Sequence, residues 1–421
     1  MAACGLDFGT SNTTLGIPGA TDRGGVPSPA LVPLEGGADT IPSAIFYPVN
    51  GERAVGRAAI GAYVDGAHGR LMRSLKSVLG TSLIDETTLV GRERLTFRRV
   101  IADYLGTVRR RAEIAAGQPL DAVVHGRPVF FVDDDPAGDQ RAEDTLRAIA
   151  GTIGFKAVSF QFEPIAASLD YERQIDREEL ALIADIGGGT SDFSIVRLGP
   201  DRRAKADRAD DILANDGVRI GGTDFDRLLS LGVVMPLLGY RSAMKREGLS
   251  VPAGYFHDLA TWSNINRLYE PKTLRALHEV ERDAADPSLF GRLVKVVEEE
   301  RGHSLAIGVE GAKIAVSEEG RAAVDLAFLE RGLAAAVERR DLVAHTETLA
   351  TRIAARVATC LAQAGVTAEA IDAVFLTGGS TRLAHVRDAI LATVPAARVV
   401  EGDTFGSVGL GLTVEAARRY G

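Results

Sequence analysis

The stretch "ALIADIGGGTSDFSIV", Ala181–Val196, places an aspartate, three glycines, a Thr-Ser pair and a second aspartate between two apolar runs. Two apolar runs separated by a glycine-rich turn predict neighbouring strands. Glycine costs conformational entropy and packs no side chain, so a plain hairpin gains little from three in a row. Glycines do let backbone N–H groups close on phosphate oxygens, and Thr and Ser hydroxyls add donors.

The two aspartates of this stretch, Asp185 and Asp192, would repel a phosphate. A Mg²⁺ ion between them and the phosphate, held largely through its waters, would reconcile the charges. The alternative is a bulged hairpin turn whose glycines supply positive φ angles. This stretch alone leaves both interpretations open.

A second copy of the pattern lies at the start of the chain. "GLDFGTSNTTLGI", Gly5–Ile17, runs in the same order, from an apolar residue and aspartate through glycine and Thr-Ser to the returning strand. Matched positions in the two copies are Asp7 and Asp185, Thr10 and Thr190, Ser11 and Ser191, and Asn12 and Asp192. Two such hairpins predict a duplicated α/β fold that closes on one anionic ligand from both sides.

Bulk composition limits the class of protein. The 421 residues suggest two or three domains, and a net charge of −9 argues against nucleic acid or an anionic membrane as an obligate partner. Two cysteines without a CxxC motif argue against a disulfide framework and fit a reducing cytoplasm, and the seven histidines form no zinc motif. The N-terminus resembles no signal peptide, and the apolar window 228–240 predicts a core helix.

Strands and helices alternate along the chain, which predicts an α/β fold. Residues Ala59–Gly80 are expected to form a helix. A P-loop is excluded because no GxxxxGK[ST] motif is present, and a dinucleotide site is not supported because no GxGxxG follows a first strand.

Two further polar clusters are candidates for ligand contacts. "VEGAKIAVSEE", Val309–Glu319, places Glu310, Lys313 and Ser317 on one helical face, which a solvated helix would also do. "FLTGGSTRL", Phe375–Leu383, places a Gly-Gly pair at a strand-to-helix turn with an arginine behind it, which a helix cap would also explain.

Six motifs occur in a fixed order along the chain: "GLDFGTSNT", "FEPIAAS", "DIGGGTSDFS", "GGTDFD", "EGAKIAVS" and "LTGGSTR". Their order resembles the nucleotide-binding domain of the seventy-kilodalton heat-shock protein family, within the actin-like ATPase superfamily. The resemblance runs from residue 5 to about residue 415. "GRPVFFV", "FQFEPIAASLDYE", "MPLLG" and "GDTFGSVGLGL" look more like the short YegD-type members.

The resemblance implies an ATP or ADP site with Mg²⁺. Asp7 and Asp192 match positions that hold the metal, mostly through water, and Asp185 matches an acid beside the hydrolytic water. The phosphate loops match Gly9, Thr10, Ser11 and Asn12, and then Gly187, Gly188, Gly189 and Thr190, with Thr190 also counted among the catalytic residues.

Further site residues come from the same resemblance. Lys76 matches a lysine that positions the attacking water or stabilises the γ-phosphate, and Glu163 matches a hinge acid near the metal. Taken alone, Lys76 fits a surface lysine and Glu163 fits a helix cap equally well. The remaining matches lie near adenosine or ribose and phosphate: Glu310, Lys313, Ser317, Gly378, Gly379, Arg382 and, more weakly, Gly221, Gly222 and Asp403.

The implied fold has two lobes of mixed sheets flanked by helices, with nucleotide in the cleft between them. We expect residues 1–178 plus 397–421 in the first lobe and 179–396 in the second, with 229–345 as a smaller capping subdomain. The implied function is a slow Mg-ATP hydrolase that switches between conformations and resembles a chaperone. Because the chain ends at Gly421, we expect no peptide-binding domain.

Three other functions remain open at this point. An actin-like filament protein would sediment in a nucleotide-dependent way, although "EGAKIAVS" and "GGTDFD" argue against it. A small-molecule kinase of the same superfamily could use Asp185 as its general base. A nucleotide-binding pseudo-enzyme is disfavoured by Lys76, Asp185 and Thr190. Expected partners are nucleotide and an unknown protein client or co-chaperone, with neither nucleic acid nor membrane.

Overall fold

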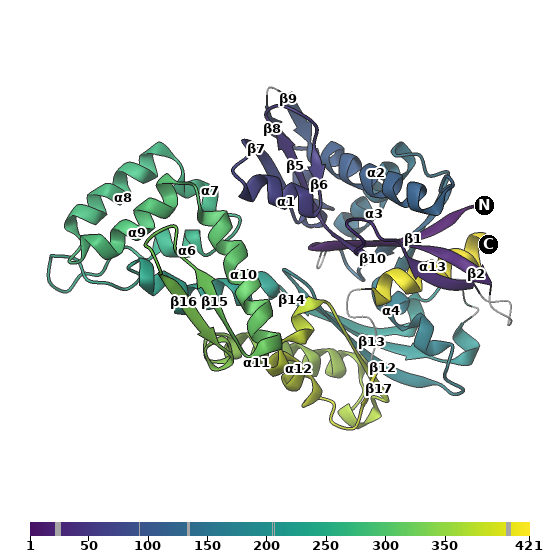
Figure 1. Ribbon diagram of the computed structural model, residues 1–421. Coiled ribbons are helices and arrows are strands. Elements are labelled where there is room, and N and C mark those ends of the chain that lie inside the picture. The colour runs from purple at the N-terminus through teal and green to yellow at the C-terminus, as the bar shows by residue number, and fades with distance from the viewer. Residues whose placement is uncertain (22–26, 92, 133–134, 204, 206, 401–405) are drawn as a thin grey trace.

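Two sheets of matching topology, each begun by one copy of the repeat, form the framework of this protein (Figure 1). The computed structural model describes residues 1–21, 27–91, 93–132, 135–203, 205, 207–400 and 406–421. The first sheet has the order β11-β10-β1-β2-β3, with β4 also paired to β2, and the second has the order β14-β13-β12-β17-β18. In each sheet two strands form an antiparallel hairpin, β1–β2 or β12–β13. The first strand of each hairpin also pairs in parallel, β1 with β10 and β12 with β17. The mixed α/β fold predicted from the repeat is therefore confirmed.

The first lobe, as the name is used from here on, comprises the first sheet and the elements packed around it. Its strands are β1 (Ala3–Phe8), β2 (Asn12–Thr21), β3 (Pro27–Leu31), β4 (Thr40–Pro42), β5 (Ala44–Pro48), β6 (Ala54–Val55), β7 (Gly69–Arg73), β8 (Thr87–Val90), β9 (Glu93–Thr96), β10 (Ala122–Arg127) and β11 (Ala157–Phe162). Its helices are α1 (Arg57–Val64), η1 (Leu75–Val78), η2 (Ser82–Asp85), α2 (Phe97–Ala116), α3 (Pro136–Thr152), α4 (Glu163–Glu172) and α13 (Ser407–Tyr420).

The second lobe comprises the second sheet and the elements around it. Its strands are β12 (Glu179–Ile186), β13 (Ser191–Leu198), β14 (Ile212–Val218), β15 (Arg321–Asp325), β16 (Ala334–Glu338), β17 (Ala373–Thr377) and β18 (Arg398–Val400). Its α-helices are α5 (Gly222–Leu229), α6 (Gly254–Leu259), α7 (Ile265–Leu268), α8 (Pro271–Asp283), α9 (Pro287–Glu298), α10 (Gly302–Glu319), α11 (Arg339–Ala364) and α12 (Ala384–Leu391). Its shorter helical turns are η3 (Pro200–Arg202), η4 (Ala209–Asp211), the π-helical η5 (Ser230–Val234), η6 (Met235–Leu238), η7 (Ala368–Ala370) and η8 (Gly379–Arg382).

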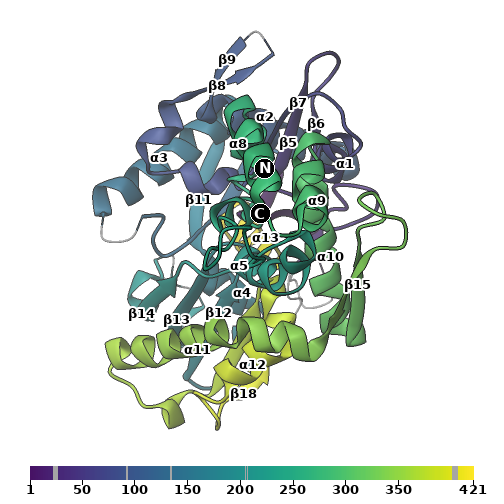
Figure 2. The ribbon, with the colours of Figure 1, turned by 90° about the vertical axis from the view of Figure 1, so that its left-hand side faces the viewer.

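Helices α4 and α13 lie between the two sheets, whereas α11 and α12 cover the outer face of the second sheet (Figures 1 and 2). A shared apolar core joins the two layers, with Ile165 of α4, Leu412 of α13, Val124 of β10 and Ile183 of β12 among its members. The two helices pack so closely that a Cβ on Gly411 would lie 1.8 Å from the carbonyl oxygen of Ala166. Burial of this apolar surface is the main force that holds the lobes together at their base.

Two expectations from the sequence are corrected by the structure. Ala59–Gly80 is not one helix, because α1 ends at Val64 and the chain continues as strand β7 and the turn η1. Residues 397–400 were expected in the first lobe, yet β18 pairs with β17 in the second sheet, and the chain rejoins the first lobe only with α13.

The apolar window 228–240 is helical, as expected, through the end of α5 and the turns η5 and η6, and both Leu229 and Leu238 are buried. Among the described residues, no helix combines the length and the hydropathy needed to cross a membrane.

Candidate active site

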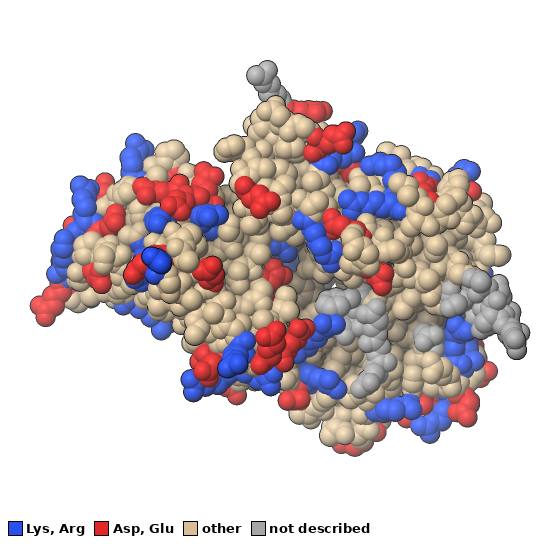
Figure 3. All heavy atoms as spheres, in the orientation of Figure 1, with Lys and Arg blue, Asp and Glu red and all other residues tan. Residues whose placement is uncertain are grey.

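Five charged residues meet where the two hairpins face each other across the cleft between the lobes. Asp7 is the penultimate residue of β1, Lys76 lies on η1 and Glu163 begins α4. Asp185 and Asp192 are paired across the β12–β13 hairpin. The molecular surface is hollowed where the lobes meet (Figure 3). Residues distant in sequence thus form one group of charges.

A direct ion pair anchors this group. Lys76 Nζ lies 2.6 Å from Glu163 Oε1, and the two side chains are only 12% and 15% exposed. A desolvated pair is screened far less than a surface pair, so it holds both groups in a defined place. Neither a surface lysine nor a simple helix-capping acid explains this contact.

The pKa values of the buried aspartates at this site are raised. Burial, followed by the negative charge of Glu163, raises the pKa of Asp7 to about 8. The same two causes, in the same order, raise the pKa of Asp185 to about 6. Because several acids share one lysine, the site has an excess of negative charge that a cation would relieve.

The two phosphate loops predicted from the repeat touch each other. A Cβ on Gly188 would lie 1.9 Å from Ser11 Oγ, so only glycine permits this approach. In the second loop the amide of Gly187 donates to the carbonyl of Thr190 (2.9 Å), and Thr190 Oγ1 donates to Asp192 Oδ2 (2.9 Å). The loops therefore form adjacent walls of one site.

A third backbone segment supports the second loop. The amide of Gly222 donates to the carbonyl of Gly187 (3.0 Å), and Thr223 donates through its amide to the carbonyl of Gly188 (2.8 Å). A Cβ on Gly221 would lie 2.3 Å from the amide nitrogen of Gly189. Gly221 and Gly222, predicted to lie near ribose and phosphate, thus lie directly against the phosphate loop.

Lys313, predicted to contact adenosine, has a partner that the sequence analysis missed. Its Nζ lies 2.8 Å from Asp226 Oδ1 and donates to the carbonyl of Gly222 (3.2 Å). Burial raises the pKa of Asp226 to about 6, with Lys313 opposing that effect. The motif "GGTDFD" contains Asp226, but only the structure shows that α5 packs against α10 so that the two charges meet.

The other predicted adenosine residues gather around the C-terminal half of α10 and the turn after β17. Arg382 Nη1 lies 3.6 Å from Glu318 Oε1, next to Ser317 on α10. Gly378 has a φ of 79°, and a Cβ there would lie 2.4 Å from the carbonyl oxygen of Ile186. Glu310 is on α10 and Gly379 begins η8, whereas Asp403 lies outside the described residues.

The donor set suits Mg²⁺ bound through water rather than a site built from side chains alone. Within the part of the chain that the structure describes, no three His, Cys, Asp or Glu side chains are grouped so as to hold a metal ion by themselves. Mg²⁺ usually keeps several waters and uses one or two carboxylates together with substrate phosphates. Asp7 and Asp192 fit that role, because Asp7 lies two residues before the first loop and Asp192 accepts a hydrogen bond from Thr190 of the second.

A family model described as "Hsp70 protein" matches residues 3–234 and 299–416, which is most of the chain. The chain belongs to the Hsp70 family. A curated Hsp70-family relative, the chaperone protein HscA homolog of Methylibium petroleiphilum, is 24% identical over 440 aligned residues. That alignment covers all of this chain and 58% of the relative.

Membership of the Hsp70 family supports the predicted nucleotide site. The matched ranges include both hairpins of the repeat, Lys76, Glu163, and the α10 residues predicted to contact adenosine. The Hsp70 model leaves out residues 235–298, a largely helical segment that contains α6 to α9.

Proposed function

We propose that this Hsp70-family protein binds Mg-ATP between its lobes and slowly hydrolyses it to ADP and phosphate, with cleft closure as its output. The observation that carries the proposal is the buried Lys76–Glu163 pair beside Asp7, Asp185 and Asp192, enclosed by two glycine-rich loops. Phosphoryl transfer to water depends mostly on positioning and on stabilising charge, and these residues supply both.

Each residue has a distinct role in this proposal. Asp7 and Asp192 hold the hydrated Mg²⁺, which when bound neutralises charge on the phosphates. Lys76, fixed by Glu163, places its ammonium beside the terminal phosphate and the attacking water. Asp185, whose pKa lies near 6, is suited to accept a proton from that water at neutral pH. Thr190 orients Asp192 through its hydroxyl.

The wider cellular role also belongs to this proposal. We infer a chaperone-like switch in the cytoplasm, whose closed state is recognised by a protein client or co-chaperone. The printed name of the HscA homolog supports a chaperone role, although the chain covers 58% of that relative. The YegD-type resemblance remains a prediction.

Replacement of Lys76 tests the proposal directly. We expect Lys76→Ala to lower kcat for ATP hydrolysis roughly 100-fold, because one charge-stabilising donor contributes about that much, while ATP binding persists. The matched control is Lys156→Ala, since Lys156 forms an ion pair with Asp121 but is 71% exposed and lies at the start of β11. Measured by single-turnover hydrolysis with Mg²⁺, equal rates for wild type and Lys76→Ala would refute the catalytic role.

A small-molecule kinase is the second candidate. A cavity between the lobes is lined by Glu163, Asp185 and Asp192 and reaches Val129 and the exposed Phe130. A phosphoryl acceptor in this cavity would lie next to Asp185, which could take its proton. ATP turnover that rises on addition of one metabolite, with a phosphorylated product, would favour the kinase over the ATPase switch.

A further inference from the structure

Strand β17 ends beside Asp185, the proposed proton acceptor. In the parallel pairing of β12 with β17, Thr377 lies in register with Asp185. Neighbouring strands of a sheet lie about 4.8 Å apart, and residues in register direct their side chains to the same face. Both residues line the same cavity between the lobes. The Thr377 side chain is therefore within reach of the Asp185 carboxylate.

The turn after β17 allows the Asp185 carboxylate to approach this strand closely. A Cβ on Gly378 would lie 2.6 Å from Asp185 Oδ1 and 2.4 Å from the carbonyl oxygen of Ile186. Gly378 also has a φ of 79°, a conformation that favours glycine. Thr381 holds the turn, because its hydroxyl donates to the carbonyl of Gly378 (2.7 Å). Asp185 Oδ1 therefore lies against the backbone that carries Thr377.

The hydroxyl of Thr377 is buried and serves no other group. The residue is 5% exposed, and among the described residues its Oγ1 has no hydrogen-bond partner besides Asp185. A buried hydroxyl without a partner is costly, whereas a hydrogen bond to a carboxylate is among the stronger ones. Burial, followed by the charge of Glu163, raises the pKa of Asp185, and the hydrogen bond with Thr377 opposes this rise. The two side chains therefore interact with each other.

A carboxylate that accepts a proton from water needs a fixed orientation. The last torsion of an aspartate side chain is broad, so the rotamer alone does not set where its two oxygens point. The accepting oxygen must lie within hydrogen-bond reach of the proton that it takes, and small misplacements are costly. A donor on one oxygen fixes the carboxylate and leaves the other oxygen for the water.

We propose that Thr377 is a positioning residue for ATP hydrolysis: its hydroxyl donates to Asp185 Oδ1 and turns the other carboxylate oxygen towards the attacking water. The inference rests on the function proposed above, in which Asp185 accepts a proton from that water. In this role Thr377 acts through Asp185 and makes no contact with the phosphates. Thr377 precedes the Gly-Gly pair of "FLTGGSTRL", but only the register of β12 and β17 shows that it faces Asp185.

Hydrolysis kinetics test this role with two variants of the same residue. Thr377→Val keeps the branched shape and removes the hydroxyl. We expect its kcat to fall roughly tenfold or more with KM for ATP unchanged, the effect of losing a hydrogen bond to a charged group that acts only in the transition state. Thr377→Ser keeps the hydroxyl and should retain a kcat near that of the wild type.

The matched control is Thr346→Val, which removes a buried hydroxyl that donates within α11 to the carbonyl of Leu342 (2.6 Å). Its kcat should match that of the wild type. An unchanged kcat in Thr377→Val, or an equal loss in Thr377→Ser or Thr346→Val, would overturn the positioning role.

A double-mutant cycle separates this inference from the proposed function, because it needs no nucleotide. We expect Thr377→Val to lower the urea midpoint of the wild type but not that of Asp185→Ala, in which the Thr377 hydroxyl has no carboxylate to lose. Thr346→Val should lower the midpoint equally in both backgrounds. Equal losses from Thr377→Val in both backgrounds would contradict the inference, whereas a wild type that does not hydrolyse Mg-ATP would contradict the proposed function.

Discussion

Asp7 and Asp185 occupy matched positions in the two hairpins, yet their surroundings differ. The pKa of Asp7 rises to about 8 and that of Asp185 to about 6, with burial as the largest cause for each. After burial and Glu163, which act on both groups, the charge of Asp185 further raises the pKa of Asp7, whereas a hydrogen bond with Thr377 lowers the pKa of Asp185. The repeat in the sequence therefore predicts the positions of these acids but not their charge states.

The raised pKa of Asp7 predicts how stability depends on pH. A carboxyl group whose pKa is higher in the folded state contributes stability at low pH, and this contribution is lost as pH rises towards the folded-state pKa. We expect the Tm of the nucleotide-free protein to fall by a few degrees between pH 5 and pH 8, and Asp7→Asn to flatten that slope. Thermal unfolding followed at several pH values checks this.

Mg-ATP should counteract the fall in Tm that the nucleotide-free protein shows at higher pH. Because Mg²⁺ favours the ionised carboxylates, the increase in Tm on adding Mg-ATP should be larger at pH 8 than at pH 6. The same pH slope in wild type and Asp7→Asn would show that Asp7 is not its source. Asp121→Asn is a suitable control, since this half-buried residue pairs with Lys156, at the opposite end of β10 from Arg127.

Among the elements, the region from Ala59 to Gly80 shows the limit of local patterns. Its apolar spacing fits a helix, but the chain forms α1, then strand β7, which pairs with β5, and then η1. Pairing with β5 overrides the local helix propensity of this region. As a strand, β7 buries the Met72 side chain, and its backbone N–H and C=O groups form hydrogen bonds with β5. The break places Arg73 over the Trp262 ring and Lys76 beside Glu163.

The close packing of α5 against the proposed phosphate loop requires glycine at position 221. A Cβ there would meet the backbone of Gly188 and Gly189, at 2.5 Å and 2.3 Å, so Gly221→Ala must push α5 away from the loop. We expect KM for ATP to rise roughly 10-fold or more in Gly221→Ala, since small misplacements at phosphate sites are costly.

Gly311→Ala provides the comparison for this change. A Cβ on Gly311 meets nothing within 4 Å on the exposed side of α10, so steady-state kinetics should match wild type. Normal KM in Gly221→Ala would mean that the third backbone segment does not support the loop during nucleotide binding.

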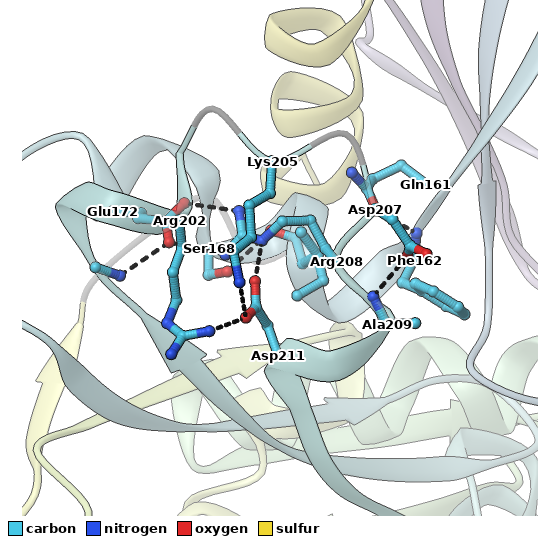
Figure 4. A network of polar contacts seen from close by, with 12 residues as sticks. Gln161, Phe162, Ser168, Glu172, Arg202, Lys205, Asp207, Arg208, Ala209 and Asp211 are labelled. Carbon is cyan, nitrogen blue, oxygen red and sulfur yellow. Dashed lines mark hydrogen bonds and ion pairs between the residues drawn. The ribbon is translucent and has the colours of Figure 1, made fainter.

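At the scale of the whole molecule, a buried ionic network ties α4 to the connection between β13 and β14. Arg208 donates two hydrogen bonds to Glu172, at 2.8 and 3.0 Å, and also pairs with Asp211, which Arg202 contacts in turn (Figure 4). The side chains of Arg208, Glu172 and Asp211 are at most 2% exposed. Because α4 begins with Glu163, this network fixes the far end of the helix that enters the active site.

Removing one charge from this network should destabilise the fold. Glu172→Gln leaves Arg208 partly uncompensated in the interior, and we expect the free energy of unfolding to fall by about 3 kcal/mol. The control Glu178→Gln breaks the pair with Arg202 at a residue that is 57% exposed, and should change stability by less than about 1 kcal/mol. Urea unfolding compares them, and equal effects would show that the buried network contributes no more than a surface pair.

The amino-acid sequence by itself determined the duplicated hairpins, the α/β class and the two glycine-containing loops, because these depend on local glycines, alternating apolar runs and a repeat. It also predicted Lys76 and Glu163 by resemblance to the Hsp70 family, but not that they form an ion pair. Only the tertiary structure decided which distant charged side chains meet, as Asp226 with Lys313 and Glu172 with Arg208, and that the Tyr63 hydroxyl is hydrogen-bonded to His303. Those pairings depend on how helices pack between and around two sheets, a geometry that no local spacing of residues contains.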